Sequence, residues 1–136
     1  TAICRYLESL YPEPNLFGGS PMEIASIEMW QCRVHNELMI PLAMGFRHLH
    51  PAMASMENQN KEYGEAQKQI AIKSLGYFNG VLGESEFVAG ARYTFADIQM
   101  ITTTDFFIKL NRLELSDYPD IQRHSELMSN RESFTA

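Results

Sequence analysis

Basic residues are scarce in this 136-residue sequence: 11 Lys and Arg stand against 17 Asp and Glu, which gives a formal net charge of −6. The few cations, Arg47 and Lys68 among them, are scattered along the chain and form no stripe. Nucleic acids and anionic membranes are bound by clustered Lys and Arg. We therefore expect neither of them to be a main partner.

Long apolar runs are missing too, and none approaches the length needed to cross a bilayer. The first ten residues carry Arg5 and Glu8 inside an amphipathic pattern, which differs from a secretory signal. These absences favour a cytoplasmic protein. The chain begins at Thr1, within a helix-like pattern and without Met, so we expect this start to be a cut in a longer protein.

Cysteine is limited to Cys4 and Cys32, which lie far apart and form no Cys-x-x-Cys motif. This pattern predicts two reduced cysteines that pack as small core residues in a cytoplasmic protein. His48 and His50 could suggest a metal site, but residues two positions apart on a helix point in different directions. We expect no bound metal.

Apolar periodicity predicts an all-α protein, an up-down bundle of about five helices. Tyr11-Pro12-Glu13-Pro14 ends a first helix, because proline disfavours a helical conformation in the residue before it. Pro41 is expected to kink or break a long second helix, and Gly83 to form the C-cap of the third. The expected helices span residues 1–10, 21–49, 62–82, 95–109 and 119–129. The expected divisions are a terminal helix at 1–11, a linker at 12–20 and a helical domain at 21–136.

Two helix starts carry capping boxes. Ser20 can accept a hydrogen bond from the amide of Glu23, whose carboxylate can reach back toward Ser20. Thr94 is the second N-cap, and Asp97 at the third helical position replaces the usual Glu. Capping explains the spacing of Thr94 and Asp97 completely, so we interpret Asp97 as a folding residue without a catalytic role.

The long helix at 21–49 is apolar on two sides. Such a helix is expected to lie between two other surfaces. The first stripe consists of Ile27, Trp30, Val34, Leu38, Leu42, Phe46 and Leu49. The second stripe consists of Met22, Ala25, Met29, Cys32, Met39 and Ala43.

The segments Phe87-Val88-Ala89-Gly90 and Thr94-Phe95-Ala96-Asp97-Ile98 resemble the FxAG…(S/T)xADI signature of the C-terminal domain of glutathione S-transferases. The resemblance continues in order along nearly the whole chain, with bacterial members of the family in particular. Two positions depart from it: His124 stands where relatives often carry Trp, and Glu132 where they carry Pro. The further matching segments are Thr1–Leu7, Tyr11-Pro12, Leu16-Phe17-Gly18, Trp30 with Glu37, and Tyr118-Pro119 through Phe134.

The resemblance implies that this chain is the helical part of an enzyme that conjugates glutathione to apolar electrophiles. The residues that activate the thiol belong to a thioredoxin-like N-terminal domain, whose last helix residues 1–11 resemble. The chain therefore has no catalytic residue to assign, and alone it is expected to be inactive. The helical domain would supply dimer contacts and a wall for the electrophile, for which the candidates are Met39, Ala43 and Phe46. Ordinary core packing is the alternative explanation for these three residues.

One bacterial branch of the family has a His after the Glu-Leu pair of this helix, where the present chain has Met39. That branch also places an Asn two residues after the Trp, within reach of glutathione in the partner subunit, and Cys32 holds this position here. By this resemblance Cys32 is the candidate contact to glutathione. A different function remains open at this stage, a non-catalytic protein-interaction module built on the same fold.

Overall fold

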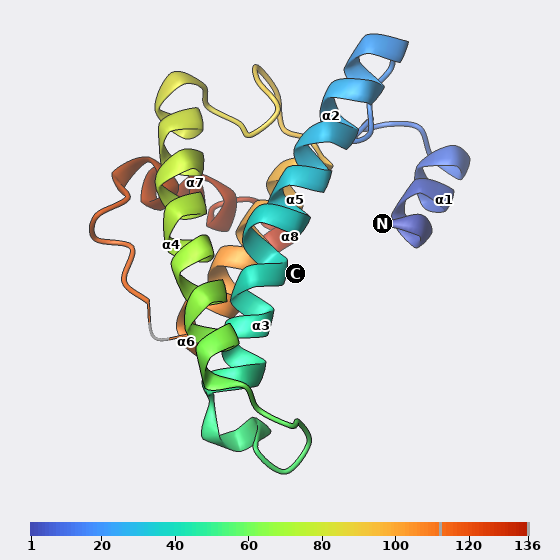
Figure 1. Ribbon diagram of the computed structural model, residues 1–136. Helices are drawn as coiled ribbons and strands as arrows, with labels where there is room; N and C mark the ends of the chain where they lie inside the picture. The colour runs from blue at the N-terminus through green and yellow to red at the C-terminus, as the bar shows by residue number, and fades with distance from the viewer. Residues whose placement is uncertain (112, 136) are drawn as a thin grey trace.

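The computed structural model describes residues 1–111 and 113–135, and no strand forms within those ranges. The expected all-α fold is confirmed (Figure 1). In chain order the elements are α1 (Ala2–Leu10), α2 (Pro21–Arg33), the π-helix η1 (Val34–Met39), α3 (Ile40–Leu49), the 3-10 turn η2 (Pro51–Met53), α4 (Lys61–Glu84), α5 (Phe95–Thr103), the π-helix η3 (Thr104–Ile108), α6 (Lys109–Asn111), α7 (Pro119–Ser129) and α8 (Glu132–Thr135).

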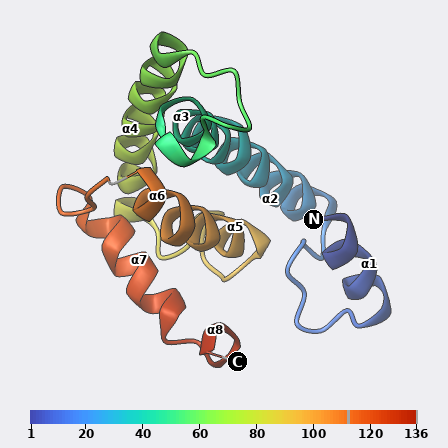
Figure 2. The same cartoon turned by 90° about the horizontal axis from the view of Figure 1, so that it is seen from below.

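Two continuous rods organise the bundle. The first runs through α2, η1 and α3, and α4 returns along α3 after a short connection. The second runs through α5, η3 and α6 and also packs along the first rod. α7 packs on α4 and α5, whereas α1 lies apart from the bundle beyond α2 (Figures 1 and 2).

The first rod continues through Pro41 without a break, and the π-helix η1 lies just before that residue. Pro41 has no N–H, so the ladder shifts there, and the amide of Ile40 donates to the carbonyl of His35, five residues back. The first stripe repeats every four residues at Val34, Leu38 and Leu42, which is wider than the 3.6-residue turn of an α-helix. The wider π turn keeps these three side chains on one face, and all three are buried.

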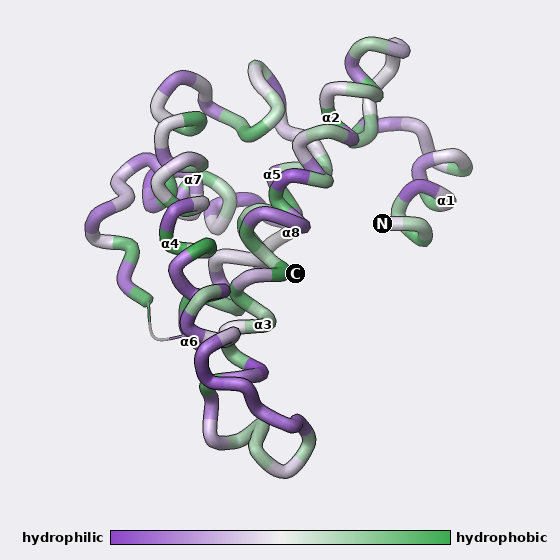
Figure 3. Tube along the Cα trace, in the orientation of Figure 1, coloured by the Kyte–Doolittle hydropathy of each residue, from purple (hydrophilic) through white to green (hydrophobic). Residues whose placement is uncertain are grey.

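The core lies between the first rod, α4 and the second rod. Asn60 begins α4 by accepting a hydrogen bond from the amide of Tyr63 at 2.9 Å. In Figure 3 green and purple segments alternate along the first rod, in keeping with apolar and polar side chains on different faces. The central cluster contains Val34, Leu38, Leu42, Ala71, Leu75, Phe78, Leu82, Val88, Ala96, Met100, Ile108 and Ile121.

The predicted C-cap at Gly83 is wrong, because α4 continues to Glu84 and ends at Ser85 in an extended conformation. Gly83 instead faces the start of α7: a Cβ built there would lie 3.2 Å from a carboxylate oxygen of Asp120. On the same side of α4, Oδ1 of Asn79 accepts hydrogen bonds from the amides of Asp120 and Ile121, at 2.9 and 3.2 Å. A side chain of α4 therefore caps α7, which has no side-chain cap of its own.

α1 is amphipathic but contains no buried residue. Ile3 is 75% exposed, and Tyr6, Leu7 and Leu10 are exposed as well. Across the described ranges, no helix combines the length and the apolar character that a membrane span requires.

Candidate functional site

Asp97 is fully buried at the start of α5, where its carboxylate accepts hydrogen bonds from three chain segments. One oxygen accepts from the amide of Thr94 at 2.9 Å and from its hydroxyl at 3.1 Å. The other oxygen accepts from the amide of Val88 at 2.8 Å. The side chain thus caps its own helix and also fixes the loop before it.

His124 of α7 completes this network and was missed by sequence reasoning. Its Nε2 lies 3.0 Å from Oδ1 of Asp97, and the His124 side chain is 1% exposed. Because Val88 and His124 share one oxygen of Asp97, α5, α7 and the loop before α5 meet at a single carboxylate. A lone His in a sequence gives no signal for such a distant partner.

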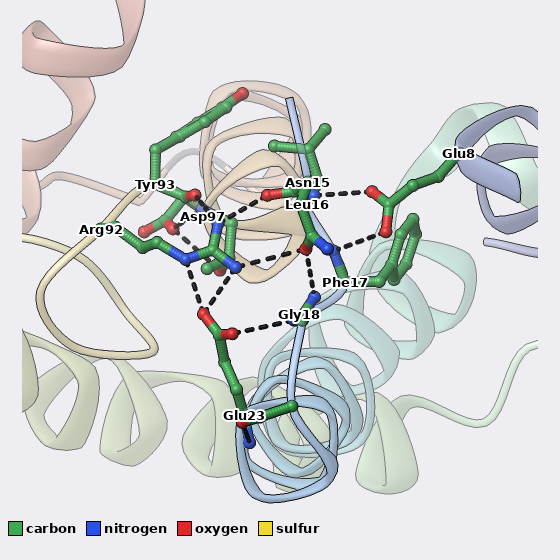
Figure 4. Close-up of polar contacts among 12 residues, drawn as sticks. Glu8, Asn15, Leu16, Phe17, Gly18, Glu23, Arg92, Tyr93 and Asp97 are labelled. Atoms are coloured by element: carbon green, nitrogen blue, oxygen red, sulfur yellow. Dashed lines mark hydrogen bonds and ion pairs between the residues drawn. The ribbon is translucent and has the colours of Figure 1, made fainter. Parts of the chain in front are cut away.

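Arg92 joins the linker, α2 and the loop before α5 (Figure 4). Its guanidinium donates to the Glu23 carboxylate at 2.6 Å and to the carbonyl of Asn15 at 2.5 Å. The hydrogen bond from Arg92, with a smaller contribution from the amide of Gly19, holds the pKa of Glu23 below its ordinary value. Ser20 accepts from the amide of Glu23 at 3.2 Å, while the Glu23 carboxylate also accepts from the amide of Gly19 at 2.9 Å.

Residues 12–20 are held at two further points, one on α1 and one on α5. The carboxylate of Glu8 accepts from the amides of Leu16 and Phe17, at 2.6 and 3.2 Å (Figure 4). Phe17 is buried and stacks on Phe95 with ring centroids 4.6 Å apart. Gly18 has a φ of +104°, and a Cβ there would lie 2.7 Å from the amide nitrogen of Ile24, so the tight turn requires glycine.

The second stripe of the first rod stays open in this chain. Met22 is 80% exposed and Met29 is 45% exposed. Cys32 is exposed on the same helix and Cys4 is half-buried, so the expected placement of the two cysteines in the core is wrong. Farther along the rod, Met39 and Ala43 are half-buried. Phe46 is also half-buried, and its ring stacks on His50 with centroids 4.7 Å apart. The bundle buries Ile27, Val34, Leu38 and Leu42 of the first stripe, whereas Met22, Met29 and Cys32 of the second stripe are exposed.

A helical bundle that leaves apolar side chains of one long helix exposed offers a surface on which another domain or subunit can pack. Residues 33–132 match the family described as Glutathione S-transferase, C-terminal domain. The chain belongs to this family, as its sequence motifs predicted.

Glutathione S-transferase 2 of Saccharomyces cerevisiae is 37% identical over 103 residues, which are 74% of this chain and 44% of that protein. Two crystal structures have nearly the same fold. Gtt2 of the same yeast is 30% identical, with a TM-score of 0.89, and the match covers 98% of this chain and 65% of that one. A class Gtt2 glutathione S-transferase of Vibrio parahaemolyticus is 29% identical, with a TM-score of 0.87 and coverages of 99% and 64%. The chain thus spans less than half of the curated relative and less than two thirds of these two structures.

Proposed function

We propose that this chain is the helical half of an enzyme that transfers glutathione to apolar electrophiles. The observation that carries the proposal is the open second stripe of the first rod in a domain of this family. Glutathione attacks as the thiolate, which the enzyme must stabilise at neutral pH. We assign that task to a thioredoxin-like domain outside this chain, so residues 1–136 alone are expected to be inactive.

Residues 1–11 fit the role of the last helix of that domain. The exposed apolar side chains of α1, Ile3 and Leu7 among them, would pack against the rest of it. Residues 12–20 would then be the linker between the domains, and residues 21–136 the helical domain. Glu8 and Arg92 would hold this linker in place and so set the width of the cleft.

Met39, Ala43 and Phe46 are proposed as the wall that contacts the electrophile. They lie on the half of the rod beyond Arg33, they are partly exposed, and they are apolar. Cys32 is exposed about two helical turns before Met39 and is proposed to contact glutathione of a partner subunit. Its thiol is only a weak hydrogen-bond donor, so this contact would be weaker than one from an amide side chain. The two free cysteines favour a cytoplasmic location.

In the intact protein, Met39→Ala should lower kcat/KM for a chloronitrobenzene about tenfold, because the aromatic ring loses apolar contact worth about 1.4 kcal/mol. The KM for glutathione should stay unchanged. Steady-state conjugation rates with either substrate varied would measure both effects. Met56→Ala is the matched control, since Met56 is 69% exposed in the connection before α4 and is not part of the proposed wall. It should leave all constants unchanged.

Two results would contradict the proposal. If Met39→Ala and Met56→Ala behave alike, the second stripe is not the electrophile wall. If the intact protein neither conjugates chloronitrobenzenes nor binds glutathione, the chain belongs to a protein-interaction module that has the same fold.

We also propose a homodimer in which the first half of the second stripe contacts the partner subunit. Met22 and Met29 are large apolar side chains exposed on α2, and burying them would remove their apolar surface from water. Met29→Asp should therefore shift the intact protein from dimer to monomer in sedimentation velocity. A wild-type protein that already sediments as a monomer at micromolar concentration would rule this contact out.

A further inference from the structure

A crevice of about 210 Å³ opens between the end of α3, the first half of α4 and α6. Figure 2 views the bundle from this end. The apolar side chains of its lining are Phe46, Leu49, Pro51 and Leu110, and the polar ones are His50, Lys68 and Asn111. Met39 and Ala43 of the proposed electrophile wall do not line it.

The size of the crevice limits what it can hold. An apolar cavity of about 150 Å³ accommodates benzene, so a volume near 210 Å³ suits a single aromatic ring with one small substituent. Phe46 and His50 stack on each other and offer a flat wall for such a ring. Asn111 is held in place by two hydrogen bonds from Nδ2, to the carbonyls of Leu42 and Phe107, at 3.1 and 2.8 Å.

The polar part of the lining favours an anion. Lys68 forms no ion pair with any carboxylate in the described ranges, and the lining contains no Asp or Glu although the protein is acidic overall. His50 adds a donor: its Nδ1 accepts from the amide of Ala52 at 3.2 Å, so the neutral ring carries its hydrogen on Nε2. A cation and an N–H donor beside apolar surface are suited to a carboxylate attached to a ring.

We propose that this crevice binds a small aromatic carboxylate, with the ring against Phe46, Leu49 and Leu110 and the carboxylate paired with Lys68. Phe46 also belongs to the proposed electrophile wall, so a bound carboxylate lies next to that wall. The inference concerns binding alone and does not depend on the transferase reaction.

The test is a titration of the intact, isotope-labelled protein with benzoate, followed by amide chemical shifts. Benzoate should shift the signals of Gly45 and Leu110, and Lys68→Gln should weaken its binding about fivefold through the loss of one partly exposed ion pair. Benzamide has nearly the same shape without the charge, and its affinity should be equal in wild type and Lys68→Gln. Lys73→Gln is the control, because Lys73 lies exposed on the same helix outside the crevice.

Three outcomes would overturn the inference: shifts that map away from the crevice, equal affinity of wild type for benzoate and benzamide, or unchanged benzoate affinity in Lys68→Gln. Glutathione conjugation is measured separately in the same preparations. A protein that binds benzoate but does not conjugate glutathione would contradict the proposed function and support this site. A protein that conjugates glutathione but does not bind benzoate would contradict this site and support the proposed function.

Discussion

Replacing Asp97 by Ala should lower the free energy of unfolding by about 3–5 kcal/mol. The carboxylate is fully buried and accepts hydrogen bonds from Val88, Thr94 and His124. Its removal leaves these donors buried without an acceptor, and each such group costs about 1–3 kcal/mol. The variant also loses one half of the capping box of α5, the bond from the Thr94 amide to the Asp97 carboxylate. Urea unfolding followed by far-UV circular dichroism would measure the change.

The matched control is Asp105→Ala. Asp105 lies on the same rod but is exposed, and its one ion pair within residues 1–111 and 113–135 is with Lys109, one turn away. Its loss should therefore cost about 0.5 kcal/mol or less. Asp97→Asn should fall between wild type and Asp97→Ala, since its amide oxygen can still accept while its NH₂ group faces a donor. A loss below about 1 kcal/mol for Asp97→Ala would show that the network adds little to stability.

Local signals in the sequence predicted the helices well. Ser20 and Thr94 mark the starts of α2 and α5 because capping depends on residues only three positions apart. The last helix was predicted at 119–129, and α7 spans Pro119–Ser129. The second stripe was likewise predicted from apolar residues at helical spacing, although the sequence did not show what packs against it in the intact protein.

Long-range contacts could not be predicted from the same patterns. Arg92 donates hydrogen bonds to Asn15 and Glu23, which lie about 70 or more positions away along the chain. The residues next to Arg92 in the sequence give no signal of these contacts. The π turn at Val34–Met39 depends on how the first rod packs, since Pro41 alone is compatible with a kink, a break or a shifted ladder. His124 became significant only once the fold placed it beside Asp97.

Gly64 and Gly76 show the difference between local sequence signals and long-range contacts. In the sequence both are glycines within one predicted helix, and only the structure shows that their surroundings differ. Gly64→Ala should lower the free energy of unfolding by about 2 kcal/mol, since overpacking of up to about 3 kcal/mol outweighs a gain of about 1 kcal/mol in helix propensity. A Cβ at Gly64 would lie 2.8 Å from Cγ of Leu49 and 2.9 Å from Cβ of His48. The Cβ of His48 is fixed by the backbone of α3, so it can move away only if α3 and α4 separate.

Gly76→Ala is the matched comparison, because a Cβ there meets no atom within 4 Å. The same substitution should raise the free energy of unfolding by about 1 kcal/mol through helix propensity alone. Urea unfolding of both variants under one set of conditions should therefore give changes of opposite sign, about 3 kcal/mol apart. If Gly64→Ala is stabilising as well, α3 and α4 do not approach each other as closely as the contact of Gly64 with His48 and Leu49 indicates. The crevice at that end of the bundle would then be wider than a single aromatic ring.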